Sequence, residues 1–345
     1  MLPERLKPFA TPQPILDHGY LLLVDVMGDE DAIVQAARVS YAAGPKKGKD
    51  DRNLLRYLMR ARHTSPFEQV CIKLEVKLPI YVERQWARHR TASWNEVSGR
   101  YSVLPDECQK TPEDGWRTQA TDNKQGSGGF VTDWPADLPS LTPPEDSQRR
   151  LALDAGDPAT VKNFDHPGEY LSDREERLQA FAREVYDERL KFGVAKEQAR
   201  CVLPVATYTS KVWTIDLHNL LHFLALRMDH HAQKEIRDYA NAIAEIVKVW
   251  VPNVWEAFED YRLKAMYLTR QEVEGLRAML RNIPYEESTF DQWSDVLLPA
   301  MALHGAGFLA ESHAGSYPKA EAALASVKSR ESVEFRAKLA RLLGK

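Results

Sequence analysis

The sequence has very little cysteine: only Cys71, Cys108 and Cys201 occur among its 345 residues. An odd number of widely separated cysteines excludes a disulfide framework as the organising feature and provides no thiolate set for a metal. The chain also lacks an apolar run near the length of a membrane span, and the first residues, MLPERLKPFA, lack the apolar core of a signal peptide. We therefore expect a protein of the reducing cytoplasm without a membrane partner.

A strong excess of charge is absent as well, since the formal net charge is −4 at pH 7. Proteins that bind bulk nucleic acid carry a large positive excess, so we predict no nucleic-acid partner and expect any anion site to be local. The glycine-rich phosphate loops GxxxxGK and GxGxxG do not occur either. A phosphate ligand therefore needs a different kind of site.

The hydrophobic fraction of 43% is sufficient for a sizeable core, and its periodicity changes along the chain. Alternation in CIKLEVKLP (71–79) predicts a strand, and the β-branched and aromatic residues of VATYTSKVWTI (205–215) predict a second. Helical periodicity is present at 29–42, 50–63, 79 to about 89, 174–193, 217–230 and 230–250. Asp216 directly precedes the helix at 217–230 and can cap it. These patterns predict a mixed α and β fold.

Composition and periodicity along the chain suggest one domain over residues 1–268 and a helical C-terminal extension over 269–345. From about 104 to 173 the sequence is dense in turn formers and poor in periodic apolar residues, which predicts a surface insertion within the domain. No role follows from the sequence for the insertion or the extension.

One stretch, ERQWARHRTASWNEVSGRY (83–101), concentrates cations and hydrogen-bond donors. If the helix that starts near Pro79 reaches residue 89, Gln85, Arg88 and His89 share a face at its C-terminal end. A solvated cationic end that complements the helix dipole is the simpler interpretation. The loop that follows favours a ligand site, because it adds hydroxyls, a glycine that permits close backbone approach and a further guanidinium. The stretch therefore predicts binding of a phosphorylated nucleotide.

RHRTASWNEVS also fits the pattern RHRx7S, and through it the sequence resembles the flavin-dependent thymidylate synthases. AARVSY, HTSPFEQ, EQARCVLP and LRMDHHAQKEIRDYA fit the same family in the same order. The resemblance implies an α+β fold, a strand-containing core wrapped by long helices, and a homotetramer with active sites at subunit interfaces. It also implies reductive methylation of dUMP to dTMP, with FAD as cofactor, methylenetetrahydrofolate as carbon donor and NADPH as reductant.

The resemblance assigns roles to individual residues. Arg227 is implied as the catalytic arginine, placed against the pyrimidine ring. The implied dUMP contacts are Gln85, Trp86, Ala87, Arg88, Glu96, Val97, Ser98, Gly99, Arg100, Arg200 and Arg227. The implied FAD contacts are Ser40, Ser65, Glu68, Arg88, His89, Arg90, Glu96, Asp216, His218 and His222. His63 and Tyr101 are weaker candidates for the face on which folate or nicotinamide stacks.

One helix departs from the family pattern, because Asp216, His218 and His222 stand where some members carry Asn, Arg and Asn. Two histidines four residues apart could share a metal, but HNLLH lacks the glutamate of HExxH, and only His230 or His231 is near enough in sequence to add a ligand. Polar packing or ligand contact is the commoner role, so we predict no metal site.

Other interpretations concern single residues and the reaction. Cys201 could act as a nucleophile beside Arg200, although the apolar run CVLPV favours a small buried hydrophobe. Trp86 and Trp94 could stack on a ligand ring, although aromatic residues at a helix end are more often part of the core. A flavin-dependent enzyme acting on C5 of another pyrimidine nucleotide, or a non-catalytic nucleotide-binding homologue, would retain most of the same residues.

Overall fold

The computed structural model describes residues 2–39, 51–121, 126–134 and 164–274. Contacts divide the chain into two units, Met1–Ala265 and Met266–Lys345. Among the described residues of the second unit, the Glu272 carboxylate accepts a hydrogen bond from the Thr269 N–H at 2.6 Å, as in a helix N-terminal capping box. Ser40, residues 122–125 and 135–163 of the predicted insertion, and the extension after residue 274 lie outside the described residues.

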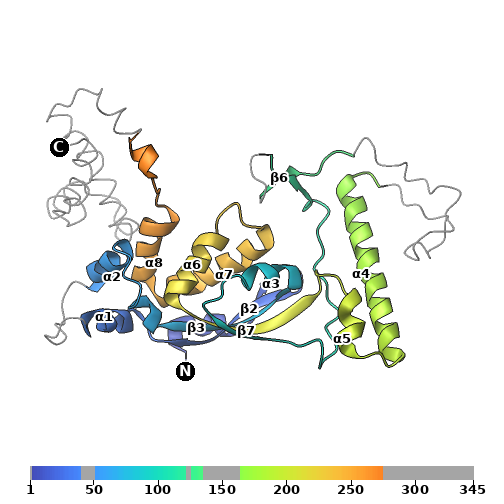
Figure 1. The fold of residues 1–345 in the computed structure, drawn as a ribbon, viewed down its shortest axis with the longest axis horizontal. Coiled ribbons are helices and arrows are strands. Elements are labelled where there is room, and N and C mark those ends of the chain that lie inside the picture. Colours follow the sequence, from blue (N-terminus) through green and yellow to red (C-terminus); the bar gives the residue numbers. More distant parts are fainter. Residues whose placement is uncertain (1, 40–50, 122–125, 135–163, 275–345) are drawn as a thin grey trace. The chain divides into compact units, whose positions relative to one another are not determined.

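The first unit is built on a five-stranded antiparallel sheet with the order β1-β2-β3-β7-β4 (Figure 1). Its strands are β1 (Gln13–Ile15), β2 (Gly19–Met27), β3 (Cys71–Pro79), β7 (Tyr208–Asp216) and β4 (Ser93–Glu96). The central pair β3 and β7 are the two strands predicted from the sequence, and they pair along their full lengths. Both predictions are confirmed, as is the α+β class.

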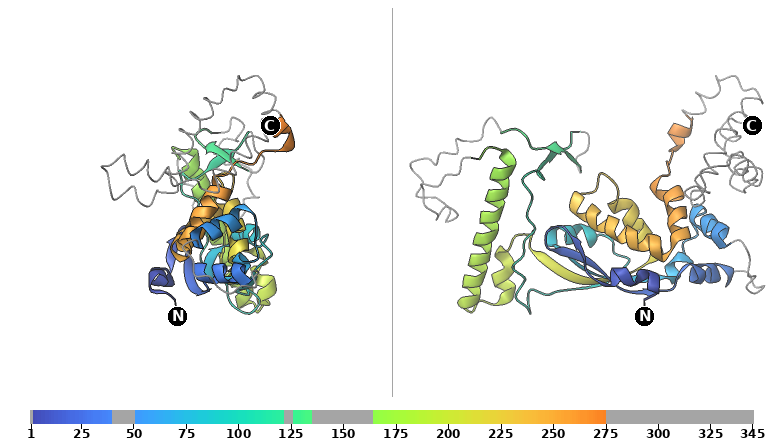
Figure 2. Two further views of the ribbon diagram at one scale, coloured as in Figure 1. Left: turned by 90° about the vertical axis from the view of Figure 1, so that its left-hand side faces the viewer. Right: turned by 180° about the vertical axis from the view of Figure 1, so that it is seen from behind.

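One face of the sheet carries the core. The side chains of β3 that point to this face are fully buried: Ile72, Leu74, Val76 and Leu78. Figures 1 and 2 show the helices that cover this face, α3 (Ile80–Trp86), α6 (Leu217–Arg227) and α7 (Lys234–Trp250). The apolar residues of α6 and α7 recur with the helical period, so most of them lie on one face of each helix and are buried against the sheet.

The sequence analysis did not predict three strands of the sheet, β1, β2 and β4. In β2, LLLV places apolar side chains on both faces, so the strict alternation of a half-buried strand is missing. All four residues of β4 are exposed, and this strand falls in the stretch predicted to be a loop. That prediction is wrong at Ser93–Glu96, because an edge strand is held by backbone pairing with β7 and needs no hydrophobic pattern.

The helices confirm the predicted elements with shifted ends. α3 ends at Trp86 rather than near residue 89, and α4 (Pro167–Lys191) begins inside the predicted insertion and ends before Gly193, whose φ is 74°. The other helices are α1 (Glu30–Val39), α2 (Asp51–Arg60), α5 (Lys196–Ala199), α8 (Pro252–Phe258), and the short segments η1 (Glu4–Ala10), η2 (Phe67–Gln69), η4 (Arg200–Val202) and π-helical η5 (Glu259–Leu263). None of the helices in the described part of the chain is long and apolar enough to span a bilayer. Within the described part of the predicted insertion, β5 (Arg117–Gln119) and β6 (Ser127–Phe130) form a small hairpin.

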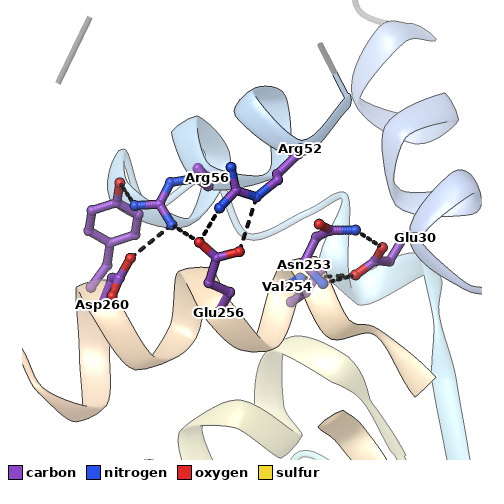
Figure 3. A network of polar contacts seen from close by, with 8 residues as sticks. Glu30, Arg52, Arg56, Asn253, Val254, Glu256 and Asp260 are labelled. Atoms are coloured by element: carbon purple, nitrogen blue, oxygen red, sulfur yellow. Dashed lines mark hydrogen bonds and ion pairs between the residues drawn. The ribbon is translucent and has the colours of Figure 1, made fainter. Parts of the chain in front are cut away.

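A polar network joins α2 to α8 and η5 (Figure 3). Arg56 of α2 donates from Nη1 to Glu256 at 3.0 Å and to Asp260 at 2.8 Å. Arg52 donates from Nε to the second oxygen of Glu256 at 3.0 Å. At the start of α8, Glu30 of α1 accepts from the Asn253 N–H at 2.6 Å, which satisfies a backbone donor that the helix itself leaves free. The network fixes α8 and η5 against α1 and α2.

Gly19 at the start of β2 provides a test of the packing between sheet and helix. A Cβ at Gly19 would lie 2.1 Å from the Tyr239 hydroxyl and 2.8 Å from the Lys77 carbonyl, the two groups joined by a 2.6 Å hydrogen bond. We predict that Gly19→Ala lowers the free energy of unfolding by about 2 kcal/mol, in the range for overpacked sites, as measured by urea or thermal unfolding. The control is Gly129→Ala, where a Cβ meets no atom within 4 Å. Equal midpoints for the two variants would contradict the packing described.

Candidate functional site

The site begins where α3 ends. After Trp86 the chain makes one further turn, with His89 N–H bonded to the Trp86 carbonyl at 3.0 Å, and then leaves for β4. The shorter helix separates the three members of the RHR triplet: Arg88 and Arg90 are exposed, whereas His89 is half-buried. Neither arginine has a hydrogen-bonding or ion-pairing side-chain partner within the described residues. Two unpaired guanidinium groups are thus presented at one edge of the fold.

Arg227, the last residue of α6, lies against this turn. Its Nε donates to His89 Nε2 at 2.9 Å, and its Nη2 donates to the Gln85 carbonyl at 3.3 Å. Because Nε2 accepts, the neutral imidazole carries its proton on Nδ1. The structure therefore brings together Gln85, His89 and Arg227, which the sequence placed in blocks far apart.

Burial keeps His89 neutral. The ring packs edge-on against Phe223 at a centroid distance of 4.8 Å and lies 6.1 Å from the ring of His222. Burial, followed by the charge of Arg227, lowers the pKa of His89 from 6.5 to about 4. An acceptor is therefore available to Arg227 at neutral pH, which orients the guanidinium without neutralising it.

A buried ion pair between Lys211 of β7 and Glu83 of α3 lies under the turn. The Lys211 ammonium lies 4.4 Å from the centroid of the Trp86 ring, a cation–π contact. Burial lowers the pKa of Lys211 to about 8, so the lysine is protonated at neutral pH, and burial raises the pKa of Glu83 against the opposing effect of the lysine. Sequence reasoning missed this pair. The alternation of side chains along β7 was the available signal, because it puts Lys211 on the same strand face as the buried Trp213 and Ile215.

The loop after β4 meets the segment that follows α5. Gly99 is buried, and a Cβ there would lie 3.0 Å from Arg200 Cδ, so glycine permits this close approach. Arg100 Nε lies 3.2 Å from the Glu197 carboxylate, and Lys196 donates to the Tyr101 carbonyl at 2.8 Å. The residues predicted to bind dUMP from these two blocks are therefore neighbours.

Glu96 closes the edge strand onto β7, because the Thr209 hydroxyl donates to its carboxylate at 2.8 Å. Arg200 has no hydrogen-bonding or ion-pairing side-chain partner within the described part of the chain. The loop thus offers one anchored carboxylate and one unpaired guanidinium.

A cavity of about 300 Å³ lies along one face of α6. Its polar lining consists of Arg62, His63, Thr64, His218, His222 and Arg262. Its apolar lining consists of Leu58, Met59, Phe67, Leu221, Ala225 and Phe258. No carboxylate belongs to this described lining, so the cavity fits a ring compound that carries an oxyanion, and FAD meets that description.

The structure gives positions for four of the residues predicted to contact FAD or dUMP: Ser65, Glu68, Asp216 and Trp86. Ser65 and Glu68 are exposed beside the cavity-lining residues Thr64 and Phe67. The Asp216 carboxylate caps α6 by accepting from the Asn219 N–H at 2.9 Å, as predicted from the sequence. Trp86 is only 1% exposed and packs with Trp213, so its interpretation as part of the core is confirmed and its ring is closed to a ligand.

The remaining dUMP candidates are accessible. Ala87 and Ser98 are half-buried and Val97 is exposed.

The interpretation of Cys201 changes with the structure. Cys201 is exposed, and its thiol donates to the Glu197 carbonyl at 3.4 Å, so the expectation of a buried hydrophobe is wrong: the side chain points away from the core at the end of a short helix.

His218 and His222 both line the cavity, as their spacing of four residues on one helix suggested. The ligand atoms of Asp229, His230 and His231 lie within 4.8 Å of one another on the surface.

Fold and site together define an α+β protein with unpaired guanidinium groups beside a cavity suited to a ring-bearing oxyanion. Residues 22–253 match the profile of the family described as thymidylate synthase complementing protein. The chain is 47% identical to a flavin-dependent thymidylate synthase of Thermus thermophilus over 275 residues, which is 80% of this chain and 88% of the relative. It is 43% identical to a protein of the same name from Gluconobacter oxydans over 306 residues, covering 86% and 88%.

A solved structure agrees with these relatives. It is that of a UMP/dUMP methylase, PolB, from Streptomyces cacaoi bound with 5-Br dUMP, which aligns with a TM-score of 0.57 and 28% identity over 73% of this chain and 99% of that one. The chain belongs to the flavin-dependent thymidylate synthase family. The enzymes of this family depend on FAD and use NADPH and methylenetetrahydrofolate as co-substrates.

The buried neutral state of His89 predicts a pH dependence of stability. In the unfolded chain a histidine titrates near 6.5, and in the fold His89 titrates near 4, so between these values the unfolded chain binds a proton that the folded chain excludes. Stability is therefore fully present above about pH 6.5 and declines as the pH falls toward about 4. His89→Gln does not titrate and should flatten this part of the profile.

The measurement is the thermal midpoint of parent and variant between about pH 7 and pH 5, compared with His230→Gln, which removes an exposed histidine. Parallel profiles for the parent and His89→Gln would show that His89 is not held neutral by burial.

Proposed function

We propose that this protein converts dUMP to dTMP, taking the carbon from methylenetetrahydrofolate and the reducing equivalents from NADPH through FAD. The observation that carries the proposal is the fixed guanidinium of Arg227, held by His89 Nε2 and the Gln85 carbonyl beside the RHR turn. Membership of the family supports the same reaction. In the net reaction the hydrogen on uracil C5 is replaced by a methyl group, and the folate leaves as tetrahydrofolate.

Arg227 has the role of activating the pyrimidine. Uracil C5 becomes nucleophilic when negative charge on the ring oxygen and N3 is stabilised, and a preoriented guanidinium in a water-poor pocket provides that stabilisation. Arg227 is half-buried, and burial lowers its pKa without removing its charge at neutral pH. The chemistry that FAD supplies when bound is hydride transfer from NADPH to the one-carbon unit.

The dUMP phosphate and sugar are assigned to the unpaired cations and to the loop. Arg88 and Arg200 match phosphate oxygens with their planar forks. Ser98, Gly99 and Arg100 add hydroxyl and backbone donors where the loop meets Arg200. Gln85, Ala87, Val97 and Glu96 complete the set, and Trp86 contributes by packing in the core beneath them.

The flavin is assigned to the opposite side of the turn. His218 and His222 line the cavity that contacts His63, and His89 bridges from the ring of His222 to Arg227. Arg90, Ser65, Glu68, Glu96 and Asp216 are the further contacts proposed, together with Ser40, which lies outside the described residues. This arrangement puts nucleotide and flavin on two sides of one helix end.

We also infer a cytoplasmic homotetramer in which neighbouring subunits complete each site. Arg88 and Arg90 point outward without a partner inside the described part of their own chain. Val97 is 45% exposed and Val212 is 38% exposed on the outer side of the β4–β7 edge, which is apolar surface that a second copy would cover. These features support assembly through the open face of the sheet.

A second substrate has support of its own. Two solved structures that align with this chain are of a protein named as a UMP/dUMP methylase, in complexes with 5-Br dUMP and with 5-Br UMP. Methylation of UMP would use the same arginines, since the two nucleotides differ only at the ribose 2′ position. Product analysis with both nucleotides decides between them.

The proposed function is tested with the purified protein. We expect an oxidised-flavin absorbance spectrum that shifts on addition of dUMP, and formation of dTMP when NADPH and methylenetetrahydrofolate are present. UMP is assayed in parallel, and 5-methyl-UMP as the main product would favour the second substrate. A protein that binds dUMP but neither retains nor takes up FAD would contradict both and support a non-catalytic homologue.

Arg227→Ala tests the catalytic assignment. We predict that kcat falls by at least roughly 10²-fold to 10³-fold, the cost of losing one preoriented charge-stabilising group, while FAD stays bound. Cys201→Ala is the matched control, because it removes the exposed thiol next to Arg200 and should retain activity. An Arg227→Ala enzyme with parental kcat would remove Arg227 from the catalytic step. An inactive but folded Cys201→Ala enzyme would show that the thiol is required for the reaction.

A further inference from the structure

The end of α2 has an unusual backbone. Arg62 N–H bonds to the Met59 carbonyl at 3.3 Å and His63 N–H to the Leu58 carbonyl at 2.9 Å, the hydrogen-bond pair of a Schellman motif. In this motif Arg62 takes the left-handed position, with φ at 60°. Glycine is the usual residue there, because a Cβ is strained against the following carbonyl in that conformation.

Only two described residues other than glycine have a positive φ, Arg62 and Leu16. Leu16 packs against the hydrophobic core, which provides an apolar gain for its strained backbone. Arg62 is exposed and lines the cavity along α6. A strained residue that faces a ligand cavity is an indication of function when the same turn would form more easily with glycine.

The fixed positive charge of the cavity comes from two residues on separate elements. α6 contributes His218 and His222, whose imidazoles carry a full charge only when protonated. Arg62 at the end of α2 and Arg262 in the π-helical segment η5 contribute guanidinium groups, which stay charged. The apolar part of the lining includes Phe67 and Phe258.

The two elements are held in place by the network of Figure 3. Arg56 of α2 pairs with Glu256 and Asp260, and its Nη2 donates to the Tyr261 hydroxyl at 2.9 Å. Tyr261 directly precedes Arg262 in η5. The network therefore fixes the backbone that carries Arg262 relative to the helix that ends in Arg62, which sets the spacing of the two guanidinium groups.

We propose that Arg62, paired with Arg262, binds the oxyanion of the heteroaromatic ligand that occupies this cavity, and that the left-handed backbone at Arg62 is retained to place its guanidinium there. This inference rests on the proposed function, which supplies two ligands of that chemistry: FAD with its pyrophosphate, and methylenetetrahydrofolate with its carboxylates. Both present planar or forked oxygen pairs that match a guanidinium.

The test uses substitutions that separate side chain from backbone. Arg62→Gly removes the guanidinium and suits the left-handed position, Arg62→Ala removes it and leaves the strain, and Arg62→Lys keeps the charge without the fork. We expect Arg62→Gly not to lower the thermal midpoint of the apoprotein, and Arg62→Gly and Arg62→Ala to lose the same ligand contact. Arg174→Ala, which removes an exposed arginine of α4 outside the cavity lining, is the control for charge loss.

Two measurements identify the ligand. If the oxyanion belongs to the flavin, Arg62→Gly and Arg262→Gln weaken FAD binding by about tenfold to a hundredfold in a fluorescence titration of apoprotein, and riboflavin binding is unchanged. If it belongs to folate, FAD binding is unchanged, and KM for methylenetetrahydrofolate rises by a similar factor with kcat retained. Either result supports the proposal, and Arg62→Lys should recover part of the loss.

Parental FAD affinity together with parental KM in both variants would overturn the proposal. Failure of the proposed function is distinguishable, because it would appear in the parent protein as absence of dTMP or 5-methyl-UMP. The FAD and riboflavin titrations need no turnover and remain informative in that case.

Discussion

The buried ion pair between Lys211 and Glu83 joins the middle of α3 to β7, and the rest of the site is arranged around that junction. Removing two charges from water costs several kcal/mol per ion, which only close pairing and further contacts offset. Here the lysine also lies over the Trp86 ring, so the cation is compensated on two sides. A pair of this kind contributes little net stability but strongly disfavours other positions of α3. It thereby fixes the turn from which Arg88, His89 and Arg90 extend.

Arg227 completes the turn because two helices end at the same point. Arg227 is the last residue of α6, and it donates to a carbonyl in the last turn of α3. The C-terminal ends of both helices carry partial negative charge, which favours a cation between them. His89 adds an acceptor whose burial keeps it neutral. The guanidinium is therefore oriented by dipoles rather than by a carboxylate, and its full charge stays available to a ligand.

The cavity along one face of α6 depends on polar contacts outside the site, which set the positions of residues inside it. Arg56 and Glu256 hold α8 and η5 to α2, and Glu30 satisfies the first backbone donors of α8. These groups do not line the cavity, yet they determine where Phe258 and Arg262 lie relative to Arg62. The strained backbone of Arg62 fits the same logic, since its cost is local and its effect is the position of one side chain.

The sequence by itself determined the strands β3 and β7, the amphipathic helices, the RHR signature and the family, because alternation, helical periodicity and motif spacing are properties of neighbouring residues. It also indicated Asp216 as a helix cap, a local interaction. It did not indicate the edge strand β4, the pairing of Lys211 with Glu83 or the exposure of Cys201. Only the tertiary structure decided these, since each depends on contacts between segments that are distant in the chain. The meeting of Arg227 with His89, 138 residues apart, is the decisive case. Antiparallel pairing of β3 with β7 places α3 and α6, the helices that directly follow these strands, over one face of the sheet, and no local pattern encodes that encounter.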